Sequence, residues 1–161
     1  MKHKEIFISI VIIIILIIID QLTKLIAFKN LEYDVTYKCV PGLFKVQLVK
    51  NTGAAFGILS GKMWFFNIIT IISLFIFAFL MKDVNFAKAS IFTVSLCMII
   101  SGTIGNFIDR VLLGYVRDFL TFDFVNFAVF NFADVCLTVG VVLLIFDYIF
   151  GATGVLWKKS I

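Results

Sequence analysis

The chain alternates between long apolar stretches and short polar ones, and four of the apolar stretches are long enough to cross a membrane. A bilayer core of about 30 Å needs roughly 20 apolar residues in helical form. Windows of that kind lie at about residues 6–28, 63–81, 89–108 and 132–150. The first is rich in isoleucine, but lipid requires a helix there because only helices or closed barrels satisfy every backbone hydrogen bond. We therefore predict four transmembrane helices, with both termini on one side.

Between the first two windows lies the one sizeable polar segment, at about residues 30–60. In the stretch FKVQL, apolar side chains beginning at Phe44 alternate with Lys45 and Gln47, which is the period of a half-buried strand. Pro41–Gly42 stands before this stretch as a turn. We predict a membrane all-α fold with a small β-element, namely a bundle of four transmembrane helices plus an extracytoplasmic β-cradle. Residues 1–161 are expected to form a single domain.

Composition narrows the class of protein. Hydrophobic residues make up 62% and charged residues 15% of the 161 positions, and the mean hydropathy is +1.13, which excludes an ordinary soluble domain. The net charge of +4 comes from lysines spread along the chain. This distribution favours anionic lipid headgroups over nucleic acid as partners. The basic start MKHK, and aspartates that offset the arginines on the far side, indicate a multi-pass protein with both termini cytoplasmic.

Cysteine and histidine do not indicate a metal site. Cys39, Cys97 and Cys136 show no paired spacing, and His3 is the only histidine. Zinc sites and Ser-His-Asp triads need histidines or cysteines in defined sets. We therefore expect neither a metal nor a cofactor, and we interpret the cysteines as small packing residues.

Polar side chains return at five places beside the apolar windows. Charged groups at membrane depth cost several kcal/mol, so they are expected to pair, to face a cavity or to take part in chemistry. If the helices alternate in direction, all five places fall on the same membrane face. The residues are Asp20 and Lys24 in DQLTK; Asn51 and Gly53 in NTGAAFG; Asn106, Asp109 and Arg110 in GTIGNFIDR; Asp118 in VRDF; and Asn131, Ala133 and Asp134 in FNFAD.

Each of these places also has a purely structural interpretation. Asp20 and Lys24 are four residues apart and can form an ion pair on one helix face. A polar residue within 131–134 can cap the last helix. Gly102 and Gly105 make a smooth face for close helix contact. A functional interpretation rests on all five places occurring together.

Asp118 and Asp134 are the pair that we single out for chemistry. Two carboxylates in a poorly solvated site cannot both ionise easily, so they share a proton. The ionised one can take a proton from water while the protonated one donates to a carbonyl oxygen. These steps produce a tetrahedral diol from a peptide bond without a metal, serine or cysteine.

The five motifs, in this order and interleaved with four apolar windows, closely resemble those of the bacterial lipoprotein signal peptidases, also called signal peptidase II. The resemblance covers nearly the whole chain. It implies an aspartic endopeptidase of the bacterial inner membrane that cuts prolipoproteins before the diacylglyceryl-modified cysteine of the lipobox. It further implies an active site at the extracytoplasmic face and binding of globomycin-type inhibitors. We expect the protein to contact membrane lipids and to be a monomer.

By the same resemblance, Asp118 and Asp134 are the catalytic dyad. An amide side chain near them can bind substrate backbone or orient a carboxylate, and Arg110 can form a fork to a carboxylate or a lipid phosphate. The residues implied to shape the pocket or to hold substrate and dyad in place are Asp20, Lys24, Asn51, Gly53, Asn106, Asp109, Arg110, Asn131 and Ala133.

Two residues depart from the pattern of these peptidases. Arg117 stands where the family often has valine, and Val135 stands where it often has serine. An inward Arg117 would lower the pKa of Asp118, whereas neighbours in an extended segment place their side chains on opposite faces. The assignment of base and acid within the dyad stays open.

Other functions are consistent with the residues alone. A small ion- or proton-coupled membrane carrier is the alternative, because intramembrane Asp and Lys residues are typical of proton relays. A scaffold without activity is a third. Changes at Asp20 or Asp109 should damage a carrier most, and changes at Asp118 or Asp134 an enzyme. The phenylalanine-rich residues 118–132 favour an aromatic belt at the interface, with a mobile flap as the alternative.

Overall fold

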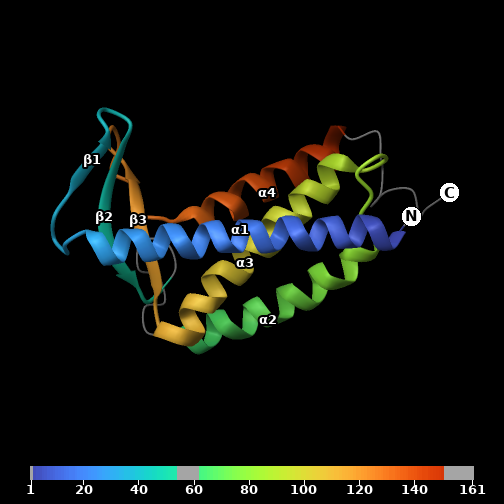
Figure 1. Ribbon diagram of the computed structural model, residues 1–161, viewed down its shortest axis with the longest axis horizontal. Coiled ribbons are helices and arrows are strands. Elements are labelled where there is room, and N and C mark those ends of the chain that lie inside the picture. Colours follow the sequence, from blue (N-terminus) through green and yellow to red (C-terminus); the bar gives the residue numbers. More distant parts are fainter. Residues whose placement is uncertain (1, 54–61, 151–161) are drawn as a thin grey trace.

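The computed structural model describes residues 2–53 and 62–150 (Figure 1). Residues 54–57 of the NTGAAFG motif lie outside this part. The predicted fold class is confirmed, because four long apolar helices carry a small antiparallel sheet. The elements in chain order are α1 (Lys2–Asn30), β1 (Tyr37–Val40), β2 (Phe44–Asn51), α2 (Met63–Leu80), the short 3₁₀ helix η2 (Met81–Asp83), α3 (Ser90–Leu113), β3 (Val116–Phe122) and α4 (Phe132–Phe150).

Helix α3 is the centre of the bundle and contacts α1, α2 and α4. Its inner face is fully buried at Phe92 and Leu96, while the other three helices expose large apolar side chains, as contact with lipid requires. The helix continues to Leu113, past the predicted end near residue 108. It ends at Gly114, whose φ of +77° suits a glycine, and the Gly114 N–H donates to the carbonyl of Arg110 at 3.2 Å.

Glycines let α3 approach its neighbours closely, as predicted for Gly102 and Gly105. A Cβ atom at Gly102 would collide with the backbone oxygen of Ala133 in α4. A Cβ atom at Gly105 would lie 2.5 Å from Oδ2 of Asp20 in α1. This close packing brings polar residues of α1, α3 and α4 together.

The three strands form one antiparallel sheet in the order β1-β2-β3 at one end of the bundle (Figure 1). The alternation beginning at Phe44 is confirmed as strand β2. Pro41–Gly42 forms the turn that precedes it: Gly42 has a φ of +77°, and the Leu43 N–H donates to the carbonyl of Val40 at 2.9 Å. The first turn of α1 and the last turn of α4 lie at the opposite end of the bundle from the sheet.

The β-element predicted from residues 30–60 is incomplete, because its third strand comes from residues 116–122. Strand β3 pairs with β2 in a register that sets Asp118 opposite Val49 and Val116 opposite Asn51. Both faces of β3 are covered, so its sequence does not alternate between apolar and polar residues. The consequence for the site is that Asp118 lies close to the end of β2.

Candidate active site

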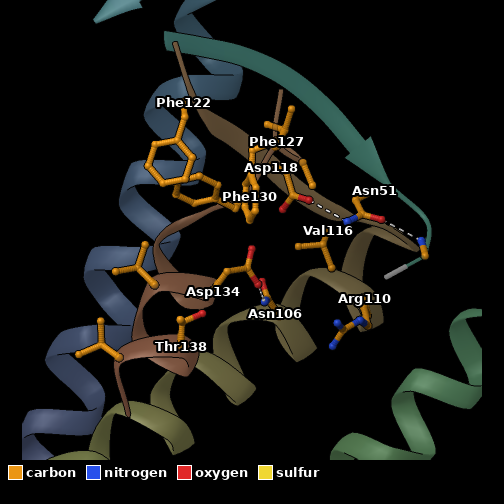
Figure 2. Close-up of a pocket in the computed structure, with 15 residues that line it drawn as sticks. Asn51, Asn106, Arg110, Val116, Asp118, Phe122, Phe127, Phe130, Asp134 and Thr138 are labelled. Carbon is orange, nitrogen blue, oxygen red and sulfur yellow. Dashed lines mark hydrogen bonds between the residues drawn. The ribbon is translucent and has the colours of Figure 1, made fainter. Parts of the chain in front are cut away.

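A cavity of about 440 Å³ opens where the sheet meets α3 and α4. Figure 2 shows the side chains of Asp118 and Asp134 pointing into it from β3 and α4. Its walls are mostly apolar, with a few polar groups converging on the two carboxylates, which is the usual composition of a ligand site. The lining residues are Asn51, Gly53, Asn106, Arg110, Val116, Asp118, Phe122, Phe127, Ala128, Val129, Phe130, Asp134, Val135, Thr138 and Val139.

Asp118 is 2% exposed and is held by two amide side chains. Asn51 Nδ2 donates to its Oδ2 at 2.8 Å, and Asn131 Nδ2 donates to its Oδ1 at 2.6 Å. The pKa of Asp118 is raised to about 7, first because the group is buried and second because of the carboxylate charge of Asp134. Asp118 is therefore partly protonated at neutral pH.

Asp134 belongs to the first turn of α4 and forms a reciprocal cap with Asn131. The Asp134 N–H donates to Asn131 Oδ1 at 3.1 Å, and the Asn131 N–H donates to Asp134 Oδ2 at 3.0 Å. The other carboxylate oxygen, Oδ1, accepts a hydrogen bond from Asn106 Nδ2 at 2.7 Å. The expected cap is thus present, and the same residues also face the cavity.

Asn106 and Asn131 join the two carboxylates into one network. Asn106 Oδ1 accepts from Lys24 Nζ at 2.9 Å and from Asn131 Nδ2 at 3.1 Å. These two donors fix the orientation of the Asn106 amide, so that its Nδ2 faces Asp134. Asn131 in turn contacts both Asp118 and Asp134, and it is fully buried. We call Asp118 and Asp134 the dyad from here on.

A second group of buried charges lies beside the dyad. Lys24 Nζ is 2.9 Å from Asp20 Oδ2 and 3.6 Å from Asp109 Oδ2, and Arg117 Nη2 is 2.7 Å from Asp109 Oδ1. Asp20 Oδ1 also accepts the Ala133 N–H at 2.9 Å, in the first turn of α4. We call Asp20, Lys24, Asp109 and Arg117 the ion cluster. The predicted pair of Asp20 and Lys24 is confirmed, within a larger set of contacts.

The two departures in sequence differ in their consequences. Arg117 points to the face of β3 opposite Asp118, as expected for neighbours in an extended segment, and binds Asp109. It therefore does not hold the pKa of Asp118 low. Val135 follows Asp134 and lines the cavity.

Arg110 (Figure 2) and Gly53 complete the polar side of the cavity. In the described part of the chain, the guanidinium of Arg110 is not within 4.0 Å of a carboxylate, and its buried Nε has no hydrogen-bond partner. The guanidinium lies 5.6 Å from the centre of the Phe66 ring of α2. Gly53 N–H donates to Asn51 Oδ1 at 2.9 Å, which fixes the Asn51 amide so that its Nδ2 faces Asp118.

Several residues of the site were not singled out by sequence reasoning. Gln21 binds both Asp20 and Arg117. The rings of Phe122, Phe127 and Phe130 pack against one another and form one wall of the cavity. On α4, Thr138 and Val139 line the cavity along with Val135, and their spacing of three and four residues is the signal that could have identified them.

The five polar places of the sequence thus meet at the sheet end of the bundle. Within residues 2–53 and 62–150, no group of three His, Cys, Asp or Glu side chains is placed to hold a metal ion. Two carboxylates in a shared pocket, held by amides, are suited to acid–base chemistry on a polar bond. On a bundle of four membrane-spanning helices, this arrangement defines the class of membrane aspartic peptidases.

Comparisons with known proteins identify the family within that class. The family model described as signal peptidase (SPase) II matches residues 12–150. The lipoprotein signal peptidase of Lactiplantibacillus plantarum is 40% identical over 139 residues, which cover 86% of this chain and 92% of that protein. The lipoprotein signal peptidase of Streptococcus thermophilus is 43% identical over 145 residues, which cover 90% and 89%.

A solved structure of a bacterial membrane enzyme has the same fold, with a TM-score of 0.79 and 37% identity, covering 88% of this chain and 87% of that one. The chain belongs to the signal peptidase II family of aspartic peptidases, as the resemblance in its motifs implied. It is a bacterial membrane enzyme that removes signal peptides from prolipoproteins.

Proposed function

We propose that Asp118 and Asp134 perform the cleavage, and that the bond cut is the one before the diacylglyceryl-modified cysteine of the lipobox. The observation that carries the proposal is that both carboxylates face one cavity and accept hydrogen bonds from amide groups. No lysine or arginine nitrogen of residues 2–53 and 62–150 lies within 4.0 Å of either. The pair can therefore change its protonation state during a reaction.

The chemistry needs only the dyad and one water molecule. The ionised carboxylate takes a proton from water, whose oxygen forms a bond to the carbon of the scissile carbonyl. The protonated carboxylate donates to the carbonyl oxygen, which gives a neutral tetrahedral diol. Collapse of the diol breaks the C–N bond: the protonated carboxyl of the dyad gives its proton to the leaving amine, and the other carboxylate takes a proton from one diol hydroxyl, whose oxygen becomes the carbonyl oxygen of the new carboxyl group. The dyad ends with the single shared proton with which it began.

The surroundings of the dyad suit a lipidated peptide. The cavity lies at one end of the bundle, so acyl chains can stay among apolar helices while the scissile bond reaches water. Val135 and Val139 of α4 belong to the apolar wall of the cavity, which suits contact with acyl chains. We assign to Asn51 and Arg110 the binding of substrate polar groups, because amide and guanidinium donors suit carbonyl or carboxylate oxygens.

The remaining polar residues support the dyad from behind. Asn106 and Asn131 orient the two carboxylates, and Lys24 fixes the amide of Asn106. Asp20 and Asp109 hold Lys24 in place. Gly53 and Ala133 act through their backbone N–H groups, which bind Asn51 and Asp20.

The decisive experiment measures cleavage of a diacylglyceryl-modified lipobox peptide by the purified protein in lipid. Asp118→Asn and Asp134→Asn keep side-chain size and remove the titrating group, and each is expected to lower kcat by about 10²–10⁴-fold. Asp123→Asn is the matched control, because Asp123 follows β3 directly and does not line the cavity. Cleavage by the dyad variants at the wild-type rate would refute the proposed roles. Cleavage at another bond would refute the proposed position.

We also propose that both termini are cytoplasmic and that the cavity opens at the extracytoplasmic face. The first turn of α1, with the basic start of the chain, lies at the end of the bundle away from the sheet, which supports a cytoplasmic N-terminus. Cys39 of β1 is exposed, whereas Cys97 and Cys136 are buried. A membrane-impermeant maleimide should therefore label intact spheroplasts at Cys39, and Cys39→Ser should abolish the labelling. Labelling only after lysis would reverse the orientation.

The same cavity is proposed to bind globomycin-type cyclic peptides, and the protein is proposed to act as a monomer. A single chain supplies both dyad carboxylates and the amides that hold them, which supports action as a monomer. Competitive inhibition of the peptide assay by globomycin would support the first proposal. Activity that rises with the square of enzyme concentration at fixed lipid would contradict the second.

A further inference from the structure

Arg117, the residue before Asp118 in β3, makes hydrogen bonds through both its side chain and its backbone N–H. Arg117 Nη2 donates to Asp109 Oδ1 at 2.7 Å, and Arg117 Nε donates to Asp109 Oδ2 at 3.2 Å, which makes a two-pronged contact. The Arg117 backbone N–H donates to the same Oδ2 at 2.9 Å. A second bond of Nη2 reaches Gln21 Oε1 at 2.8 Å. Side chain and backbone of Arg117 are therefore both attached to the helices.

Gln21 links these contacts to the rest of the helix bundle. Its Nε2 donates to Asp20 Oδ2 at 3.0 Å and to the carbonyl of Gly105 at 3.1 Å. Arg117 thus connects β3 to α1 through Gln21 and to α3 through Asp109. The side chain of Arg117 is 13% exposed and that of Asp109 is fully buried. None of Gln21, Asp109 and Arg117 lines the cavity.

The strand and the helices carry opposite halves of the dyad. Asp118 belongs to β3, whereas Asp134 belongs to α4 and is held by Asn106 of α3. The separation of the two carboxylates therefore depends on where β3 sits relative to the helices. Arg117 fixes that position one residue away from Asp118, on the opposite face of the strand.

We propose that Arg117 is a positioning residue, and that it and Gln21 form a clamp that sets the distance between the Asp118 and Asp134 carboxylates for the reaction. The inference rests on the proposed role of the dyad. The substitution Arg117→Val keeps the strand and the Asp109 bond to the backbone N–H, but it loses the fork and the bond to Gln21. The clamp contributes to the chemical step and not to substrate binding, since its atoms do not reach the cavity.

The test compares kcat and KM for the lipobox peptide in four variants of the full-length protein. Arg117→Val should lower kcat by about 10- to 100-fold, because misplacement of reacting groups by a fraction of an ångström to 1 Å costs that much, while KM changes little. Arg117→Lys keeps the charge but cannot form the fork, so it should recover only part of kcat. Gln21→Leu should lower kcat less than Arg117→Val does. The combination of Gln21→Leu and Arg117→Val should be less than additive on a logarithmic scale.

Lys50→Val is the matched control. Lys50 is the strand partner of Arg117 on the same face of the sheet, but its ammonium group lies 5.2 Å from the ring centres of Tyr33 and Tyr115 and does not contact the ion cluster. Its kcat should equal that of the wild type. Each kcat is expressed per folded enzyme, with the folded fraction taken from the size-exclusion peak.

The outcomes separate this inference from the proposed function. A purely structural Arg117 would lower the amount of folded protein and the melting temperature but leave kcat per folded enzyme unchanged, and that result would overturn the clamp. Equal kcat for Arg117→Lys and wild type would show that charge, not the fork, is what matters, and would also overturn it. If Asp118→Asn and Asp134→Asn cleave normally, the proposed function itself fails, whatever the Arg117 variants do.

Discussion

The ion cluster and the dyad each contain two aspartates, yet the partners of these aspartates differ in kind. The aspartates of the ion cluster are within 4.0 Å of ammonium or guanidinium nitrogens. The dyad aspartates accept hydrogen bonds from amides of Asn51, Asn106 and Asn131. Two neighbouring groups of the same residue type thus sit in different electrostatic surroundings.

The difference shows how one site can combine fixed charge with exchangeable protons. A carboxylate paired with a buried cation is tied to that cation, because removing either partner leaves an unpaired buried charge. A carboxylate held by neutral amides keeps its geometry in either protonation state. The ion cluster is therefore suited to holding α1, α3 and β3 together, and the dyad to acid–base chemistry. Substitutions that exchange or remove these partners test the distinction.

The largest effect on stability is expected from Lys24→Met, which removes a cation of the ion cluster. Lys24 is fully buried and faces both Asp20 and Asp109, so its loss leaves two buried carboxylates poorly compensated. Breaking a buried ion pair in this way typically costs about 3–5 kcal/mol. The free energy of unfolding should fall by about that amount in equilibrium denaturation of the protein in micelles.

Lys29→Met is the control for that measurement, since Lys29 is an exposed lysine on the same helix. Its unfolding free energy should match that of the wild type within about 0.5 kcal/mol. If Lys24→Met proves as stable as Lys29→Met, the ion cluster does not hold the helices together. The structural role that distinguishes the ion cluster from the dyad would then be refuted.

A smaller loss is expected from Gly105→Ala, which acts on the same cluster through packing. In most helices alanine is more stable than glycine by about 0.5–1 kcal/mol. Here the new Cβ would lie 2.5 Å from Oδ2 and 3.0 Å from Cγ of Asp20. Moving that carboxylate disturbs its bonds to Lys24 and to the Ala133 N–H. We expect a net loss of about 1–3 kcal/mol in the same unfolding assay; a gain in stability would show that Asp20 can shift freely.

The helices and strand β2 were predictable because each is decided by local pattern. An apolar run of membrane length must be helical, and the alternation beginning at Phe44 marks a half-buried strand. Strand β3 was not predictable in the same way. Strand β3 is buried on both faces, so its sequence lacks the alternation of apolar and polar residues that marks a strand. It pairs with β2, more than sixty residues earlier in the chain, so the residues next to it in sequence do not reveal its partner.

The candidate site was predictable as a set of residues but not as a set of contacts. The polar motifs of the sequence do converge at one end of the bundle. Gln21 was missed because it is uncharged and its partner Arg117 lies 96 residues away.

Substitutions at Asp20 or Asp109, which were expected to distinguish a carrier from an enzyme, must also be interpreted differently in the light of the contacts. Asp20 binds the Ala133 N–H beside Asp134, so damage at Asp20 is expected in an enzyme as well as in a carrier.

The smallest change in stability is expected from Asp118→Asn at pH 4 to 5, and the sign of its effect should depend on pH. The variant keeps the side-chain volume, but its NH₂ group faces a donor on either Asn51 or Asn131, which costs about one buried hydrogen bond. This loss is offset at higher pH, because the variant avoids the cost of ionising a buried carboxylate on folding. At pH 4 to 5 the wild-type Asp118 is protonated, so only the loss counts and the variant should be slightly less stable.

The pH dependence follows from the raised pKa of Asp118. An unfolded aspartate titrates near 4, whereas folded Asp118 titrates at about 7, so between these values the folded state binds more protons than the unfolded state. The contribution of Asp118 to wild-type stability is complete below pH 4 and is lost as the pH rises through 7. Unfolding free energies measured from pH 4 to 8 should therefore fall more steeply for the wild type than for Asp118→Asn, and the two curves should converge or cross toward pH 8. Parallel curves would mean that folding does not raise the pKa of Asp118, which would leave the shared proton without its site.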